Sequence, residues 1–264
     1  MNTVGSHSRL WSLGLAAVLV AGALAACSAP DDPTWDRLQE AGTLRVGMDA
    51  SFPPFESVAS DGSLAGLDVD LAREVSGRLG LDPQFVANLP YDGLYDALTA
   101  ERVDIVVSSL VVDPSRTGDY AYSDVYFDAG HVLVARGDNE MVPQMEDLSG
   151  YNLAVALGTE GDREARKWAR RLGNLDVVQH ETAVDALGAV ESGNADVALV
   201  DHVSALQAVG SGRDLVVIGE PVTETPYACA VRRESIQLLK AVNKALRAME
   251  ADGTTEALIS RWLS

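Results

Sequence analysis

The sequence predicts an α/β protein with two similar lobes, each a mostly parallel sheet flanked by helices. Short apolar runs typical of buried strands alternate with amphipathic segments of helical length along the chain, a pattern that favours parallel sheets covered on both faces. The two halves also echo each other. Asp96-Ala-Leu leads to a buried run that begins at Asp104, and Asp185-Ala-Leu leads to another at Asp196. We therefore expect two lobes of related topology.

In the first half, strands are predicted at 43–48, 84–87 and 104–109. The last is a continuous apolar run that ends in serines, which is typical of a buried parallel strand. A helix capped by Asp68 and ended by Gly80 is predicted between the first two strands, and a shorter helix follows the second. The apolar faces of these helices are formed by Leu71, Ala72, Val75 and Leu79, and by Leu94, Ala97 and Leu98.

The second half repeats this order. Thr182 opens one of its helices, with Asp185 at the capping-box position. The predicted strands are 152–156, 175–180 and 196–200, and the first helix is 159–172. The chain then returns with a strand at 227–231 and closes with helices at 235–252 and 254–262.

Two crossings between the lobes are expected, near 132–136 and near 226–231, and together they would form a hinge. The first lobe would then comprise residues 43–133 and 229–264. The second lobe would comprise residues 134–228.

Residues 1–26 are interpreted as a secretory signal peptide. His7 and Arg9 precede an apolar run that is rich in small residues, and the run is shorter than the about 20 residues of a membrane span. Its Leu-Ala-Ala-Cys ending resembles the lipobox of bacterial lipoproteins, which implies cleavage before Cys27 and a lipid on that cysteine. Residues 27–42 then form a lipidated tether and lead-in, because 28–33 is polar and proline-rich. An uncleaved helical anchor is the alternative.

The composition excludes several kinds of partner. Lys and Arg total 20 against 39 Asp and Glu, a net charge of −19, and removal of Arg9 with the signal peptide brings the mature chain near −20. Such a charge argues against nucleic acid and against a basic membrane-binding face. If Cys27 carries lipid, Cys229 has no partner for an internal disulfide, and its strand-like surroundings favour a buried thiol.

Common catalytic and nucleotide-binding motifs are missing from the sequence: it has no GxxxxGK(S/T), no GxGxxG after a strand, no HExxH and no GxSxG. His131, His180 and His202 are widely spaced, and His7 leaves with the signal peptide. We therefore predict neither a metal site nor a cofactor.

Several segments, in order, resemble one protein family, the polar-amino-acid solute-binding proteins of bacterial ABC importers. The resemblance covers nearly the whole mature chain, and it implies a Venus-flytrap (periplasmic-binding-protein) fold with the ligand between two lobes. The segments are LRVGMDASFPPFES from Leu44, GLDVDLAREVSGRLG from Gly66, YDGLYDAL from Tyr91, VDIVVSSLVVDPSR from Val103, YSDVYF from Tyr122 and ADVALVD from Ala195.

The resemblance implies ligand contacts in the first lobe. Arg116 would clamp the α-carboxylate, because a guanidinium binds a carboxylate through two parallel hydrogen bonds. Local sequence alone favours Arg116 as a surface residue of its loop, and a place in the core is the alternative for Phe52 and Tyr91. The other implied contacts are the aromatic walls Phe52 and Tyr91 and the edge formed by Ser108, Ser109 and Val111.

In the second lobe, the resemblance implies that Thr159 donates to the carboxylate and that Asp201 holds the α-ammonium. A helix N-terminus at Thr159 would add free N–H groups and a dipole that favours an anion. The alternatives are structural. Thr159 and Asp162 form a capping box, and Asp201 is placed to cap the helix that follows it.

Two positions depart from many relatives. Val111 stands where a small hydroxyl residue is common, so it can offer the ligand only its backbone. Glu160 stands where a second threonine is common, and its carboxylate would repel the α-carboxylate. Glu160 must therefore turn away or meet a cationic part of the ligand, and with Asp49 it is a candidate for recognising the ligand's side chain.

We predict that the protein captures a polar amino acid outside the cell and delivers it, as a monomer, to the permease subunits of an ABC importer, with no bond made or broken. It would be lipid-anchored to the outer face of the cytoplasmic membrane, or periplasmic in a Gram-negative cell. The alternatives are a cyclohexadienyl-dehydratase-like enzyme that uses Glu160 or Asp201 as general acid or base, and a sensor for a signalling partner. The ligand stays open between cationic amino acids and glutamine or glutamate.

Overall fold

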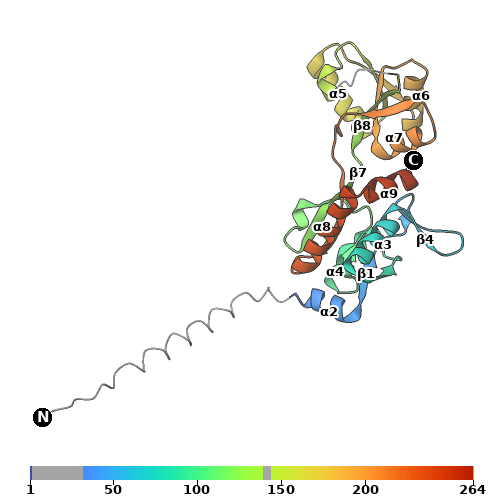
Figure 1. Cartoon of the computed structure of the whole chain (residues 1–264). Coiled ribbons are helices and arrows are strands. Elements are labelled where there is room, and N and C mark those ends of the chain that lie inside the picture. The colour runs from blue at the N-terminus through green and yellow to red at the C-terminus, as the bar shows by residue number, and fades with distance from the viewer. Residues whose placement is uncertain (2–31, 139–143, 264) are drawn as a thin grey trace.

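The computed structural model describes residues 32–138 and 144–263, together with Met1. The predicted signal peptide and Cys27 lie outside the described residues. Two five-stranded sheets form two lobes, one above the other in Figure 1. Among the described residues, no helix combines the length and the apolar character needed to cross a bilayer.

The first lobe is built on a sheet in the order β5-β1-β6-β13-β7. Its strands are β1 (Thr43–Gly47), β5 (Asp82–Val86), β6 (Ile105–Val106), β7 (Tyr120–Asp128) and β13 (Pro226–Arg232). β1 pairs in parallel with β5 and β6, whereas β13 is antiparallel to both of its neighbours. All strands except β13 therefore run in the same direction.

The second lobe has the same topology. Its strands are β8 (His131–Arg136), β9 (Asn152–Ala156), β10 (Asp176–His180), β11 (Val197–Asp201) and β12 (Leu215–Ile218). The sheet order is β10-β9-β11-β8-β12, and β8 is the single reversed strand. The prediction of two related α/β lobes is confirmed.

Helices cover both faces of each sheet, as buried parallel strands require. In the first lobe, α3 (Leu67–Leu79), α8 (Ile236–Ala251) and α9 (Thr254–Leu263) pack on one face and α4 (Leu94–Thr99) packs on the other. In the second lobe, α6 and α7 share one face and α5 covers the other. Their bounds are α5 Glu160–Leu172, α6 Ala183–Glu191 and α7 His202–Gly210.

Short elements complete the chain. A three-stranded meander follows β1, with β2 at Ser51–Phe52, β3 at Glu56–Val58 and β4 at Leu64–Ala65. Three 3-10 turns are η1 (Tyr91–Gly93), η2 (Pro114–Arg116) and η3 (Met145–Asp147).

The sequence echo between the halves has a structural counterpart. Asp104, before β6, accepts the backbone N–H of Arg45 on the neighbouring strand at 3.0 Å. Asp196, before β11, accepts the backbone N–H of Asn152 on its neighbouring strand at 2.7 Å. In each lobe an aspartate thus ties the start of one strand, β6 or β11, to its parallel neighbour, β1 or β9.

The chain crosses between the sheets at 129–130 and again over 219–225. Both crossings lie a few residues before the expected positions. β8 already belongs to the second sheet, and the whole of β13 belongs to the first. The lobe boundaries expected after residues 133 and 228 therefore shift to these two sheet breaks, because each β-strand pairs along its full length within one sheet.

One carboxylate joins the two crossing segments. Asp128 accepts the backbone N–H groups of Gly130 and Thr225, both at 2.8 Å. The segments touch so closely that a Cβ added at Gly130 would lie 1.7 Å from the carbonyl oxygen of Thr223. Glycine at this position permits the close approach of the two chains.

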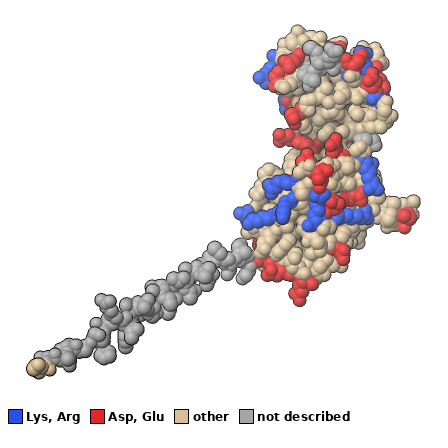
Figure 2. All heavy atoms as spheres, in the orientation of Figure 1, with Lys and Arg blue, Asp and Glu red and all other residues tan. Residues whose placement is uncertain are grey.

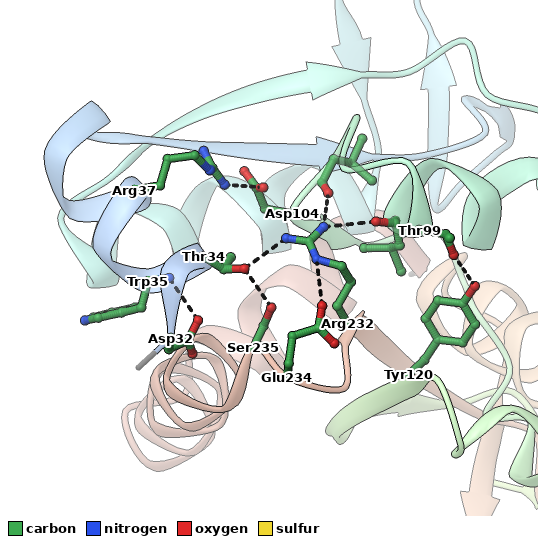
Figure 3. Close-up of polar contacts among 12 residues, drawn as sticks. Asp32, Thr34, Trp35, Arg37, Thr99, Asp104, Tyr120, Arg232, Glu234 and Ser235 are labelled. Atoms are coloured by element: carbon green, nitrogen blue, oxygen red, sulfur yellow. Dashed lines mark hydrogen bonds and ion pairs between the residues drawn. The ribbon is translucent and has the colours of Figure 1, made fainter. Parts of the chain in front are cut away.

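The lead-in to the first lobe contains a helix, α2 (Pro33–Ala41), which the sequence analysis did not predict. Asp32 accepts the N–H of Trp35 in α2 at 3.1 Å and the N–H of Gln237 in α8 at 2.8 Å, so one carboxylate caps two helices. The buried Arg232 guanidinium joins the same region to the core by donating to Thr34 Oγ1 at 3.0 Å (Figure 3). The part of the lead-in from Asp32 onward therefore belongs to the folded lobe.

Two predicted details of the first lobe are wrong. Asp68 does not cap α3: Gly66 is the N-cap, and Asp68 is buried in the first turn. The strand predicted at 104–109 is ladder-paired only over 105–106, because Ser108 and Ser109 bind buried acidic side chains instead of continuing the ladder. The C-cap at Gly80 and the buried thiol at Cys229 are confirmed.

Candidate functional site

A cavity of about 320 Å³ opens in the first lobe, beyond the carboxyl ends of β1 and β6. Ligands of open α/β sheets bind at such strand ends. The residues that line the cavity are Asp49, Ser51, Phe52, Glu56, Tyr91, Ser108, Ser109, Val111 and Tyr227. The structure thus brings together six residues that the sequence analysis named: Asp49, Phe52, Tyr91, Ser108, Ser109 and Val111.

The two aromatic residues are exposed beside this cavity and are not core. Phe52 is 50% exposed and Tyr91 is 43% exposed. The Phe52 ring stacks on Phe55 with centroids 5.7 Å apart. Asp49 accepts the backbone N–H of Tyr91 at 3.0 Å and the hydroxyl of Ser51 at 2.7 Å, so its carboxylate fixes the start of the Tyr91 turn.

Arg116 lies in an adjoining hollow that shares Tyr91 and Val111 with the cavity. Its guanidinium carbon sits 4.4 Å from the centroid of the Tyr95 ring, and its Nε lies 3.3 Å from a carboxylate oxygen of Asp113. Stacking and ion pairing hold the stem in place while about half of the side chain stays exposed. The guanidinium is therefore held at the rim of the cavity with surface left for an anion.

Two acids beneath the cavity were not named by the sequence analysis as site residues. Ser108 Oγ donates to Glu56 Oε1 at 2.9 Å, and the N–H of Ser109 donates to Asp68 Oδ2. Both carboxyl groups are buried. Burial raises the pKa of Glu56 to about 10 and also raises the pKa of Asp68. The signal available in the sequence was an acid in each of two apolar segments, FPPFES and GLDVDL.

In the second lobe, Thr159 caps α5. Its hydroxyl accepts the N–H of Asp162 at 3.2 Å and donates to the carbonyl of Ala156 at 2.8 Å. The Asp162 carboxylate accepts the N–H of Gly158 at 3.0 Å and pairs with Arg166, and this pairing lowers its pKa. Glu160 is exposed at the first position of the helix.

Asp201 ends β11 and caps α7. Its carboxylate accepts the N–H of Ser204 at 2.8 Å and the hydroxyl of the same residue at 2.7 Å. The capping role is therefore real. Tyr227 lines the first-lobe cavity, and burial raises the pKa of its hydroxyl to about 12.

His131 is a further second-lobe residue that sequence reasoning missed. It pairs directly with Asp201 across β8 and β11. Its ring packs against Gly161, where an added Cβ would lie 2.6 Å from the ring. Burial lowers its pKa, while Asp201 and Glu160 act in the opposite direction. Nothing in the spacing of the histidines indicated this position, because it depends on the pairing of β8 with β11.

Thr159, Glu160 and Asp201 form a second group, and they do not line the first-lobe cavity. Arg116 thus lies in the first lobe beside the cavity, whereas Asp201 lies at the end of a strand of the second sheet. In the described ranges, no group of three or more His, Cys, Asp or Glu side chains is arranged to hold a metal ion.

Comparison with known proteins agrees with this architecture. The model for bacterial extracellular solute-binding proteins, family 3, matches residues 44–264. The L-cystine-binding protein TcyJ of Escherichia coli K12 is 30% identical over 253 residues, which cover 95% of this chain and 93% of the relative.

Solved structures give the same result. A mutant of the arginine-binding protein of T. maritima is 36% identical, with a TM-score of 0.52 over 87% of this chain and 98% of that one. An ancestral cationic amino acid solute-binding protein is 33% identical, with a TM-score of 0.61 over 88% and 100%. The chain therefore belongs to family 3 of the bacterial extracellular solute-binding proteins and is an amino-acid-binding protein of the ABC importer type.

Proposed function

We propose that the protein binds a cationic amino acid between its lobes and delivers it to an ABC permease. The observation that carries this proposal is the division of opposite charges between half-sites: Arg116 beside the first-lobe cavity and Asp201 at the second-lobe strand end. An amino acid is a zwitterion, and it satisfies both groups only when both lobes contact it. The ligand therefore has a higher affinity for the closed state than for the open one, which drives closure.

Each backbone charge of the ligand has a matching group. Arg116 is half-exposed, stacked and held at the cavity rim, so its fork is oriented for a carboxylate. The N-terminus of α5 behind Thr159 adds an anion-favouring dipole from the other lobe. Asp201 offers the negative charge for the α-ammonium while it keeps its hydrogen bonds to Ser204.

The remaining charges favour a ligand with an additional cation. Asp49 lines the first-lobe cavity, and Glu160 is exposed beside Asp201 and His131. Against these three acids, Arg116 is the one cationic side chain that we place in the two half-sites. Two of the similar structures are named as binding arginine or cationic amino acids, which is consistent with this charge balance.

Two features would bring the protein to the permease: the predicted lipid anchor and the closed conformation of the lobes. The predicted lipid on Cys27 would hold the protein at the membrane and raise its effective concentration near the transporter. The closed pair of lobes would present a surface that the open pair lacks. The permease would recognise that surface.

A thermal-shift screen of the soluble form, from Ser28 onward, against all common amino acids tests this proposal. A ligand at 100 times its dissociation constant adds about 2.7 kcal/mol, and a chain of this size shifts by about 2–4 °C per kcal/mol. We expect the largest shifts with arginine, lysine or ornithine. Larger shifts with glutamate or glutamine would contradict the cationic assignment, and no shift with any amino acid would contradict the binding function.

A further inference from the structure

Two buried acid side chains support the serine edge of the first-lobe cavity. Glu56 on β3 is 1% exposed and Asp68 on α3 is 0% exposed. None of the ion pairs within the described ranges includes either residue. Burying two carboxylates without a cation costs several kcal/mol per charge. One of them must therefore keep its proton.

The contacts show where that proton lies. Tyr126 OH donates to Asp68 Oδ2 at 2.9 Å, and the N–H of Ser109 donates to the same oxygen. The other oxygen, Asp68 Oδ1, is buried and has no hydrogen-bond partner unless an acid proton supplies one. The Ser109 hydroxyl lies between the two acids, with its Oγ 3.4 Å from Glu56 Oε2 and 3.3 Å from Asp68 Oδ2. A protonated Glu56 that donates to an ionised Asp68 satisfies all of these atoms.

Among the described residues, no ion pair supplies a cation to balance a second negative charge on the pair. Burial raises the pKa of Tyr126 well above 10 and the pKa values of Tyr227 and Cys229 to about 12. These groups stay neutral over the range in which proteins are normally studied. The titratable groups around the pair are Tyr126 on β7, Tyr227 and Cys229 on β13, Tyr91 on η1 and Asp49 after β1.

The pair also fixes the backbone conformation of the serine edge, Ser108 and Ser109. Ser109 has φ +44°, a left-handed conformation that is uncommon for serine. Its N–H is held by Asp68, and its Oγ lies 3.3 Å from the same carboxylate. The Ser108 hydroxyl donates to Glu56 and accepts the N–H of Asp49 at 3.0 Å. The edge keeps this shape only while both acids occupy their places.

We propose that Glu56 and Asp68 share one proton and act as a positioning pair that holds Ser108 and Ser109 in the conformation that binds the ligand. The role of the serines rests on the proposed function. The presence of the shared proton does not, so the two claims have separate tests.

The first test needs no ligand. Glu56→Gln replaces the protonated acid with a neutral side chain that still donates to Asp68 and accepts from Ser108. In the unfolded chain Glu56 has a pKa near 4.5, whereas in the fold it keeps its proton to about pH 10. Folding of the wild type therefore takes up a proton and becomes less favourable as pH rises between these values. Glu56→Gln has no such uptake, so its Tm should exceed that of the wild type by a gap that widens by several degrees per pH unit from pH 5 to pH 9.

A constant gap across this range would overturn the shared proton. The matched control is Asp104→Asn, since Asp104 is equally buried but pairs with Arg45 at 2.6 Å. The Tm of Asp104→Asn should be lower than that of the wild type. This variant should show no advantage in Tm that grows as the pH rises.

The second test measures arginine affinity by calorimetry at pH 7 on variants that circular dichroism shows to be folded. We expect Glu56→Ala and Asp68→Asn to weaken binding at least tenfold and Glu56→Gln to recover most of the loss, while Asp104→Asn binds as the wild type does.

A tenfold loss in Glu56→Gln as well would mean that an ionised Glu56 meets the ligand. Wild-type affinity in Asp68→Asn would remove the positioning role. If Asp68→Asn does not fold, Tyr126→Phe, which removes one donor to the same oxygen, takes its place. A wild type that binds no amino acid would defeat the proposed function and leave the pH test standing.

Discussion

Among single residues, Arg116 and Asp201 are the pair that we propose to divide the recognition of a zwitterion between the lobes. Each also has a structural partner: Arg116 pairs with Asp113, and Asp201 caps α7 through Ser204. These partners keep each charged group oriented in the absence of ligand. Binding then needs less ordering of side chains, which otherwise costs about 0.5–1.5 kcal/mol for each long side chain.

Replacing Arg116 should weaken binding strongly. Arg116→Ala removes the partner of a buried carboxylate, so we expect a loss of about 2–5 kcal/mol in binding free energy. Arg116→Lys should recover only part, because lysine lacks the planar fork. Calorimetry with arginine measures both losses. The control is Arg136→Ala, which breaks a surface pair with Asp138 outside the site, and wild-type affinity in Arg116→Ala would exclude this residue from the ligand.

Glu160 tests the preference for a cation. Its exposed carboxylate stands at the first position of α5, where it also complements the helix dipole by about 0.3–1 kcal/mol. If Glu160 meets the ligand, Glu160→Gln should reduce arginine affinity while leaving glutamine affinity nearly unchanged. Calorimetry with arginine, glutamine and glutamate makes the comparison. Glu164→Gln, in the same helix and paired with Lys167, is the matched control. An unchanged ranking of the three ligands would assign Glu160 to helix stability alone.

Among the elements, the paired crossings between the lobes are the part that closure must bend. Asp128 accepts N–H groups from both segments, and Val222 N–H donates to the carbonyl of His131 at 2.7 Å. On the same side of the molecule, His202 of α7 stacks on Phe127 of β7, with ring centroids 5.2 Å apart. The proposed closure would therefore bend the chain at these two linked segments.

Gly130→Ala should disturb this hinge. The added Cβ would meet the Thr223 carbonyl, so the two segments must separate. We expect a loss of about 1–3 kcal/mol in unfolding free energy, as for overpacking in a core. Thermal unfolding compared with Gly77→Ala provides the check, since a Cβ at Gly77 meets nothing within 4 Å and alanine is favoured within a helix. Equal Tm values for the two variants would show that the crossing tolerates a side chain.

Local patterns predicted many elements because the deciding interactions are local. The bounds of β9 and the caps at Thr182 and Gly80 match the expectations. α2 was missed because a proline-rich stretch was interpreted as a tether, although Pro33 at the first helical position is itself a start signal. The short β6 was not foreseeable, since its end depends on acids from β3 and α3.

The site was predictable where a motif fixed its residues and not where tertiary packing did. Arg116, the serine edge and the aromatic pair follow from segments that resemble the family, and the structure places them around one cavity and its rim. Glu56 and His131 gain their importance from burial and from pairing between distant strands. No periodicity in the sequence encodes such contacts.

At the scale of the whole molecule, the charge is acidic overall but mixed locally. Figure 2 shows a band of basic side chains across the first lobe, within a chain of net charge −19. Basic side chains of the first lobe also form ion pairs: Arg78 pairs with Asp252 at 2.9 Å, and Arg261 pairs with Asp70 at 3.2 Å. Such exposed pairs add little stability.

Closure of the lobes is the central claim, and small-angle X-ray scattering measures it directly. The soluble form from Ser28 onward is titrated with arginine. We predict that its radius of gyration falls and that the fall saturates with the same dissociation constant as calorimetry gives. Arg116→Ala should show no fall at the arginine concentration that saturates the wild type. Saturable arginine binding with an unchanged radius of gyration would contradict the account, because the ligand would then occupy one lobe without drawing in the other.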